Sequence, residues 1–380
     1  MHFPFGNLSG IGGSLVHTTH GGKIEEFAKT YGHDLSQVLD FSTNTNLLFD
    51  LQPLRDLLRE SLEAAFRYPD PTYARLREVL AMRHGVLPEN ILPTNGSTEL
   101  IYLIARRFRA QKALIFAPAF SEYEAACSAE SLEIAFEQAL EKDDFVFWRP
   151  DHIDTIGLAK PAVAFVGNPN NPSGRLAAKD WLDRLALACE RHGTLLVADE
   201  AFMDFVRDGE KRSLALRSMR STHILVMRSL TKVFSIPGLR IGYAIGHPRT
   251  IESLARFQPT WSLNGLAQEV AIQLLADPGK WQLAHDELGQ TRQRFYEALK
   301  QVSGIKIYPS DVNFLLCRLD PNIFEIQKLQ EHLGRRRILV RLCSDFRGLE
   351  TGCFMRLALR REEENTMLIE ALKESLCYAS

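Results

Sequence analysis

The sequence is 380 residues long, 45% hydrophobic and 24% charged, with a formal net charge of −2. This composition is typical of a soluble globular protein with one large core or two unequal domains. The near-neutral charge supplies no global basic field, which argues against a nucleic-acid or anionic-membrane partner. No apolar run reaches the ~18 to 20 residues that span a bilayer.

The six cysteines are widely spaced and form neither a CxxC pair nor a metal-ligand spacing with histidine. We therefore expect reduced, mostly buried thiols, no bound metal and a cytoplasmic location. The N-terminus lacks the charged segment followed by an apolar segment that marks a secretory signal. The cysteines are Cys127, Cys189, Cys317, Cys343, Cys353 and Cys377.

Helical patterns dominate the first part of the chain. A Gly-rich stretch, residues 1–22, is interpreted as an arm that is flexible or held by a partner. Residues 23–31 then have helical periodicity and end at Gly32, a typical helix C-cap. Helical patterns continue through 51–66 and 72–85, on either side of the turn-like RYPDPT.

Short apolar runs dominate the middle of the chain, with helical stretches between some of them. Strands buried on both faces and alternating with helices indicate a mainly parallel sheet in an α/β architecture. The expected strands lie within 112–118, 162–169, 194–202, 223–230 and 240–246.

Beyond about residue 265 the pattern changes to long helices followed by separate strands, within 312–319 and 353–360. We therefore predict a large domain containing the mainly parallel sheet and a smaller α+β domain. The expected divisions are an arm at 1–22, the N-terminal part of the small domain at 23–45, the large domain at 46–265 and the C-terminal small domain at 266–380.

Polar residues follow several predicted strands, where open α/β sheets bind ligands. In TNGSTEL (94–100) a glycine-containing turn opens a helix, so Gly96, Ser97 and Thr98 could converge on a phosphate. The same pattern is typical of an ordinary helix cap with Glu99 in the first turn. The turn alone leaves both interpretations open.

Two further strand ends carry candidate ligand-binding side chains. GNPNNPSG (167–174) is dense in turn residues and reads as a plain turn, yet Asn171 could donate its amide to a phenolate oxygen of a bound ring. Asp199 ends the buried strand of VADEAF (197–202), where an unpaired carboxylate is costly, so we expect a buried cationic partner. That partner is either a structural arginine or the protonated ring nitrogen of a heterocyclic cofactor.

Lys232 lies in RSLTKVFSIPGLRIGY (228–243), between Arg228 and Arg240. Two nearby guanidiniums and a low dielectric disfavour its charged form, so the neutral, nucleophilic amine is favoured. Schiff-base chemistry requires that form. A single lysine here reads as an ordinary loop lysine, but its ordered combination with Asp199 and Asn171 favours a chemical role.

Together, NGSTE, PAFSEY, NPNNPSG, VADEAF and RSLTKVFSIPGLRIGY resemble the ordered signature of fold-type I pyridoxal-5′-phosphate enzymes, in the branch of histidinol-phosphate aminotransferase. The resemblance runs over nearly the whole chain and implies an aspartate-aminotransferase-like fold. It implies a pyridoxal 5′-phosphate cofactor in Schiff-base linkage with Lys232, with Asp199 on the pyridine nitrogen and Asn171 on the ring oxygen. Phe120 would stack on the ring, and Tyr68 would enter the partner's site of a homodimer. The cofactor phosphate would be held by Gly96, Ser97, Thr98, Ser229, Thr231 and Arg240.

Two departures from the aminotransferase pattern bear on the reaction. The residue after DEA is usually a tyrosine that bonds the cofactor's ring oxygen, whereas this chain has Phe202. The HGG of residues 20–22, followed by LDFSTNTN (39–46), is similar to the threonine-phosphate decarboxylases of cobalamin biosynthesis. Members of that subfamily remove the α-carboxylate of L-threonine O-3-phosphate as CO₂, leaving (R)-1-aminopropan-2-yl phosphate for the corrinoid nucleotide loop.

Four residues are candidates for binding the substrate. His20 could close over a phosphorylated substrate, although an incidental histidine in a disordered tail explains it as well. Asn44 matches an asparagine of both subfamilies. Arg356 matches the family's carboxylate-binding arginine, and Arg341 is a second candidate for binding a substrate anion.

The favoured function is therefore decarboxylation of O-phospho-L-threonine. O-phospho-L-serine is a close rival substrate, because one methyl group is worth only about 1 to 3 kcal/mol of discrimination. An aminotransferase acting on histidinol phosphate or a similar amine is the main alternative. A non-catalytic module that binds the cofactor is less favoured, since Lys232 and Asp199 are both present and no basic DNA-binding segment remains.

Overall fold

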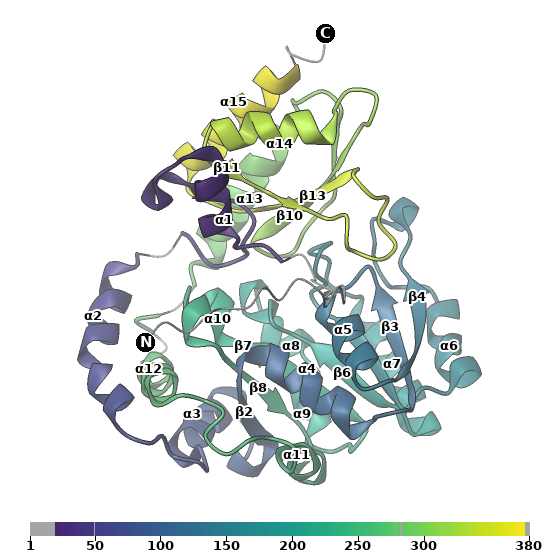
Figure 1. The fold of residues 1–380 in the computed structure, drawn as a ribbon. Helices are drawn as coiled ribbons and strands as arrows, with labels where there is room; N and C mark the ends of the chain where they lie inside the picture. Colours follow the sequence, from purple (N-terminus) through teal and green to yellow (C-terminus); the bar gives the residue numbers. More distant parts are fainter. Residues whose placement is uncertain (1–19, 49, 278, 282, 377–380) are drawn as a thin grey trace, which may run out of the picture.

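A seven-stranded sheet forms the centre of the structure, a computed structural model that describes residues 20–48, 50–277, 279–281 and 283–376 (Figure 1). Its strand order is β2-β8-β7-β6-β5-β3-β4. The pairs from β7 to β4 are all parallel, whereas β8 runs antiparallel to both of its neighbours, β2 and β7. The predicted mainly parallel α/β sheet is confirmed. The strands are β2 (Ile91–Asn95), β3 (Lys112–Ala117), β4 (Glu133–Gln138), β5 (Val163–Gly167), β6 (Leu195–Asp199), β7 (Ile224–Ser229) and β8 (Ile241–Ile245).

Helices cover both faces of this sheet. Adjacent residues of a strand point to opposite faces, and β5 shows the result: Phe165 joins one hydrophobic cluster while Ala164 and Val166 join the other. Strands buried on both faces are therefore apolar without alternation, as their sequences indicated. The helices of this layer are α2 (Gln52–Glu60), α3 (Ala74–His84), α4 (Gly96–Arg107), α5 (Glu122–Ala129), α6 (Asp151–Ala159), α7 (Lys179–His192), α8 (Gly209–Arg212), α9 (Ala215–Ser218), α10 (Leu230–Val233), α11 (Pro248–Ala255) and α12 (Gly265–Ala276).

A second, smaller sheet with its own helices lies above the large one in Figure 1. Its order is β12-β13-β10-β9 and all its pairs are antiparallel. A short parallel pair, β1 with β11, joins the N-terminal segment to this part of the fold. The elements are α1 (Ile24–Tyr31), β1 (Leu39–Asp40), α13 (His285–Leu299), β9 (Ile305–Ile307), β10 (Phe314–Leu319), α14 (Ile326–Arg335), β11 (Ile338–Leu339), β12 (Arg341–Leu342), β13 (Phe354–Ala358) and α15 (Glu362–Leu376).

Several individual expectations can be compared with these elements. Gly32 ends α1 in the left-handed conformation that its C-cap role requires. The two edge strands of the large sheet, β2 and β4, by contrast, were not among the predicted strands. Of the predicted arm, residues 1–19 lie outside the described residues, and the proposed divisions near 22, 45 and 265 stay predictions.

The cysteines and the helix lengths complete the fold. The five cysteines that the structure describes, Cys127, Cys189, Cys317, Cys343 and Cys353, are buried free thiols. In the described ranges, no helix is both long and apolar enough to cross a membrane.

Candidate active site

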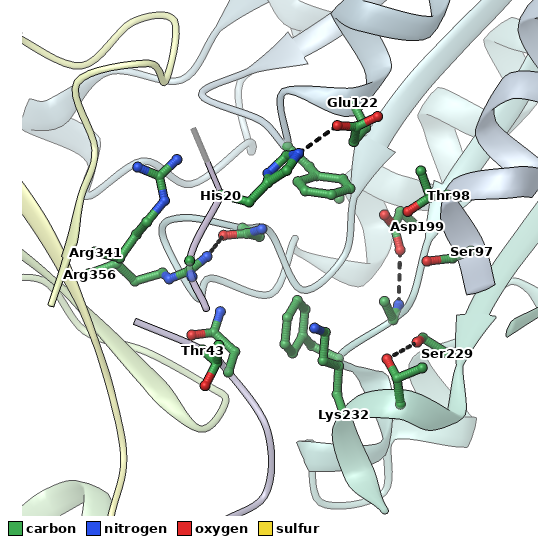
Figure 2. A pocket seen from close by; sticks show the side chains of 18 of the residues that line it. His20, Thr43, Ser97, Thr98, Glu122, Asp199, Ser229, Lys232, Arg341 and Arg356 are labelled. Carbon is green, nitrogen blue, oxygen red and sulfur yellow. Dashed lines mark hydrogen bonds and ion pairs between the residues drawn. The ribbon is translucent and has the colours of Figure 1, made fainter. Parts of the chain in front are cut away.

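A cavity of about 370 Å³ lies where the carboxyl ends of the large sheet's strands face the small sheet. The side chains that line it come from both layers and from the N-terminal segment (Figure 2). Most of the predicted site residues meet here: His20, Asn44, Ser97, Thr98, Phe120, Asn171, Asp199, Ser229, Thr231, Lys232, Arg240, Arg341 and Arg356. Gly96 and Tyr68 are the predicted residues that do not line it.

Lys232 projects into the cavity from α10, the short helix that follows β7 directly. Burial of its amine lowers the pKa of Lys232 to about 8, and the positive charges of Arg356 and Arg240 act in the same direction. A neutral amine is therefore accessible near neutral pH. This is the perturbed amine that the sequence predicted, with Arg240 correctly named as one of its two cationic neighbours.

Arg228 is the other neighbour that the sequence named, and that assignment was wrong. Arg228 is fully buried and pairs with Glu200 at 2.9 Å and with Glu210 at 3.1 Å. It precedes Ser229 on β7, and successive residues of a strand point to opposite faces. The charge of Arg228 is therefore neutralised on the face of the sheet that does not carry Ser229. Arg356, rather than Arg228, lowers the pKa of Lys232 together with Arg240.

Asp199 ends β6 and faces the cavity. The hydroxyl of Tyr123 donates a hydrogen bond to Oδ2, and the backbone amide of Ala201 donates to Oδ1 at 3.0 Å. Burial raises the pKa of Asp199 despite these two donors. No arginine in the described part of the chain forms an ion pair with this carboxylate, so the structural-arginine alternative is not met. The carboxylate is left able to pair with a cationic ligand.

Hydroxyl groups gather at the start of α4 and after β7. Ser97 and Thr98 occupy the first turn of α4 and line the cavity, and Ser229 Oγ lies 2.8 Å from Thr231 Oγ1. A Cβ atom on Gly96 would lie 2.5 Å from Nη2 of Arg240, so only glycine lets this guanidinium approach the helix terminus.

The structure is compatible with both interpretations of this turn. Glu99 accepts a hydrogen bond from the backbone amide of Asn95 at 2.6 Å and so caps α4. The hydroxyls of Ser97 and Thr98 meanwhile face the cavity. Donors at a helix N-terminus suit an anion such as a phosphate.

Arg356 links the small sheet to the turn after β5. Its Nη1 donates to Asn171 Oδ1 at 2.5 Å and its Nη2 donates to the carbonyl of Ser42 at 2.8 Å. Because Asn171 uses its oxygen toward Arg356, its amide nitrogen remains a donor. Asn44 is buried at the same wall, and its Oδ1 has no hydrogen-bond partner within the described residues.

Two further basic side chains of the cavity wall lie against carboxylates. Nε2 of His20 lies 2.6 Å from Oε1 of Glu122, and its ring lies 5.6 Å from that of Phe120 (Figure 2). Arg341 donates through Nη2 to both carboxylate oxygens of Asp345, at 2.6 and 2.7 Å. These contacts place His20 at the cavity, and its role in binding the substrate stays a prediction.

Phe202 and Tyr68 complete the predicted set. Phe202 lines the cavity and packs against Phe314, with ring centroids 5.0 Å apart, so no hydroxyl is supplied from this position. Tyr68 is 84% exposed and lies against Trp261, with centroids 4.8 Å apart.

Sequence reasoning missed Tyr123, Glu122 and Asp345 as site residues. Tyr123 stood within the PAFSEY segment, three residues after Phe120.

Known proteins resemble this chain over most of its length. Residues 36–372 match the family model described as aminotransferase class I and II. The chain is 34% identical to a threonine-phosphate decarboxylase of Salmonella typhimurium over 364 residues, which is 96% of this chain and 98% of the relative. It is 32% identical to a histidinol-phosphate aminotransferase of Caldanaerobacter subterraneus, over 81% of this chain and 84% of that one.

A solved structure agrees with these relatives. The L-threonine-O-3-phosphate decarboxylase of Porphyromonas gingivalis superposes with a TM-score of 0.80 at 30% identity, covering 88% of this chain and 98% of that chain. The resemblance read from the motifs is thereby confirmed, and so is the aspartate-aminotransferase-like fold. The chain belongs to the aminotransferase class I and II family, and it is an enzyme whose cofactor is pyridoxal 5′-phosphate.

Proposed function

We propose that this enzyme decarboxylates L-threonine O-3-phosphate to (R)-1-aminopropan-2-yl phosphate, the linker of the corrinoid nucleotide loop. The observation that carries the proposal is the pair of buried arginines, Arg341 and Arg356, facing the cavity that also holds Lys232. A substrate with two anionic groups suits two guanidiniums. The threonine-phosphate decarboxylases among the relatives favour the same substrate.

The residues of the cavity fit the cofactor. The hydroxyls of Ser97, Thr98, Ser229 and Thr231, with the guanidinium of Arg240, would hold its phosphate, and Gly96 leaves the room that Arg240 needs. Asp199 would pair with the ring nitrogen, Asn171 would donate its amide to the ring oxygen, and Phe120 would stack on the ring. Lys232 would bind the cofactor covalently through its neutral amine.

The chemistry then depends on how this chain holds the substrate. Pyridoxal 5′-phosphate, when bound, withdraws electrons from the bond that is broken at the substrate's α-carbon. Arg356, which lines the cavity, would bind and orient the substrate carboxylate. An ion pair between Arg356 and the substrate carboxylate that is too strong would oppose loss of the carboxylate as neutral CO₂, because catalysis needs the transition state to be bound better than the substrate. The substrate phosphate would therefore supply most of the binding energy, near Arg341 and His20.

Transamination is the second candidate, because the histidinol-phosphate aminotransferases among the relatives have the same scaffold. Phe202 argues against it, since it supplies no hydroxyl toward the cofactor's ring oxygen. The position of His20 at the cavity, beside Glu122, also favours the decarboxylase subfamily that has the HGG segment.

A product assay tests the proposal. The holoenzyme is incubated separately with O-phospho-L-threonine, O-phospho-L-serine, and histidinol phosphate plus 2-oxoglutarate, while CO₂ and glutamate are measured. We expect CO₂ from O-phospho-L-threonine, less from O-phospho-L-serine, and no glutamate. Glutamate formed without CO₂ would show that the enzyme is an aminotransferase.

We also propose a homodimer in which Tyr68 reaches the partner's cavity. Phe66 is 81% exposed and Tyr68 84%, and Trp261, against which Tyr68 packs, is 47% exposed. Exposed apolar groups that gather in this way are typical of an interface. Sedimentation equilibrium should give twice the chain mass, and Phe66→Asp should shift the mass toward that of one chain. A wild-type protein with the mass of one chain at micromolar concentration would contradict the homodimer.

The cytoplasmic location stays a prediction.

A further inference from the structure

Two buried arginines lie directly opposite each other on neighbouring strands of the small sheet. Arg341 of β12 is the cross-strand partner of Arg356 of β13. Each is only 6% exposed, and both line the cavity. Like charges directly opposite each other destabilise a sheet, and burial adds a desolvation cost. The arrangement therefore requires negative charge nearby.

One carboxylate supplies that charge by direct contact. The guanidinium of Arg356 donates to two neutral oxygens, those of Asn171 and Ser42, and its Nε has no partner within the described ranges. Arg341 donates to Asp345, and among the described residues this is the only carboxylate hydrogen-bonded to either arginine. Among the described residues Asp345 is thus the carboxylate in direct contact with this pair of cations, while Asp40 acts on Arg356 without a hydrogen bond to it.

The loop that carries Asp345 is held in place by its neighbours rather than by Asp345. Arg347 donates to Glu124 at 2.6 Å and lies over the ring of Phe136 at 4.1 Å from the centroid, which fixes the loop against the large layer. Phe346 is buried beside Arg341, 5.2 Å from its guanidinium carbon. The side chain of Asp345 is 19% exposed. It can therefore rotate away from Arg341 while the loop keeps its position.

We propose that Asp345 is an internal substitute for the second anionic group of the substrate. It neutralises Arg341 in the free enzyme and gives way to a phosphate monoester when substrate binds. This inference rests on the proposed function in one respect only, that the substrate is phosphorylated. A phosphate monoester carries about −1.5 to −2 charges and three acceptor oxygens at pH 7, so it outcompetes a single carboxylate. A substrate whose side chain is uncharged offers Arg341 no competing anion, so the ion pair between Arg341 and Asp345 stays intact.

The competition between Asp345 and the phosphate for Arg341 also lowers the affinity of the enzyme for its product. Decarboxylation removes the group held by Arg356 but leaves the phosphate on the product. A carboxylate that competes for Arg341 keeps phosphate binding reversible, because Asp345 returns as the product leaves. Asp345 is thus a specificity-determining residue that raises both the KM for the phosphorylated substrate and the rate of product release.

Asp345→Asn tests the exchange in the holoenzyme, whose cofactor-phosphate position is filled. Monoethyl phosphate, which has no amine and cannot react, is titrated by calorimetry. We expect its Kd to fall roughly tenfold, because a competing charge next to the binding cation is removed. The KM for O-phospho-L-threonine should fall in parallel, and kcat should fall if product release limits it. Adding Arg341→Gln to the variant should abolish the gain in affinity.

Glu350→Gln is the matched control. Glu350 lies on the same loop and pairs with Arg318 at 2.8 Å, so the variant loses the same charge without freeing Arg341. Its Kd for monoethyl phosphate should equal that of the wild type. An Asp345→Asn protein with a lower melting temperature and no gain in affinity would overturn the proposal and leave Asp345 a structural residue.

The two proposals can fail separately. If the product assay gives glutamate from histidinol phosphate while Asp345→Asn still binds monoethyl phosphate more tightly, decarboxylation is wrong and the role of Asp345 stands. If CO₂ is released but the affinity for monoethyl phosphate does not change, the role of Asp345 is wrong and decarboxylation stands.

Discussion

Replacing Lys232 with alanine is expected to abolish turnover and the visible absorbance of the lysine-bound cofactor. In the proposed function the amine would be the covalent attachment and would also carry a proton, so the loss should reach a thousandfold or more, given the roughly 10² to 10⁴-fold that acid–base catalysis alone contributes. The fold should persist, because alanine is well tolerated in the helix α10 and the variant removes a buried amine whose charge is disfavoured. Absorbance spectra and single-turnover kinetics measure the two effects.

Lys211→Ala is the control, since Lys211 is exposed and, among the described residues, pairs with Asp208 alone, at 2.9 Å. The wild type offers a companion measurement. Because burial lowers the pKa of Lys232 to about 8, the neutral amine is scarce at pH 6 and predominant above pH 8. Cofactor incorporation into the cofactor-free protein should accelerate as pH rises through about 8 and then level off. An Lys232→Ala protein that keeps the absorbance band would show that another lysine is the attachment point.

The core of the site was predictable because of the topology of a parallel sheet. Parallel strands bring their carboxyl ends to one edge, so residues that follow separate strands must meet there. Asp199 follows β6, Asn171 follows β5 and Lys232 follows β7, and all three line one cavity. Their order in the sequence was therefore sufficient to place them together.

The neighbours of these residues were less predictable, because they depend on side-chain direction and on distant segments. Arg228 is close to Lys232 in sequence but lies on the other face of its strand, where Glu200 neutralises it. Arg356, which replaces it, comes from the small sheet, and no local pattern reveals which strand of that sheet faces Lys232. The pairing of Arg341 with Asp345 was also beyond a motif, since it requires the turn of the loop between them.

One of the strands that the sequence missed, β4, has a physical explanation too. β4, EIAFEQ, is an edge strand of the large sheet, and its residues are exposed or half-buried throughout. Its apolar run is only three residues long, IAF, and is flanked by Glu133, Glu137 and Gln138, unlike the longer apolar runs of the central strands. A search for strands buried on both faces therefore passes over it.

Replacing Asp199 with asparagine is expected to lower kcat about 10² to 10³-fold, the usual effect of removing one preorganised electrostatic partner from an active site. Asparagine preserves the size of the side chain and can still accept the hydrogen bond from Tyr123, so folding should be retained. What it loses is the negative charge that would stabilise the protonated ring nitrogen, and with it the electron-withdrawing capacity of the cofactor. Tyr123→Phe is the matched control, because it removes the hydrogen bond but keeps the charge.

The control should lose less than about tenfold in kcat, since a single neutral donor contributes only about 0.5 to 1.5 kcal/mol. Fluorescence titration should also show weaker cofactor binding in Asp199→Asn than in Tyr123→Phe. If Asp199→Asn kept kcat within twofold of the wild type with the cofactor fully bound, the carboxylate could not be the partner of the ring nitrogen. The hydrogen bonds from Tyr123 and Ala201 and the nearby charge of Lys232 would then be the only groups of the described chain that offset the cost of burying this carboxylate.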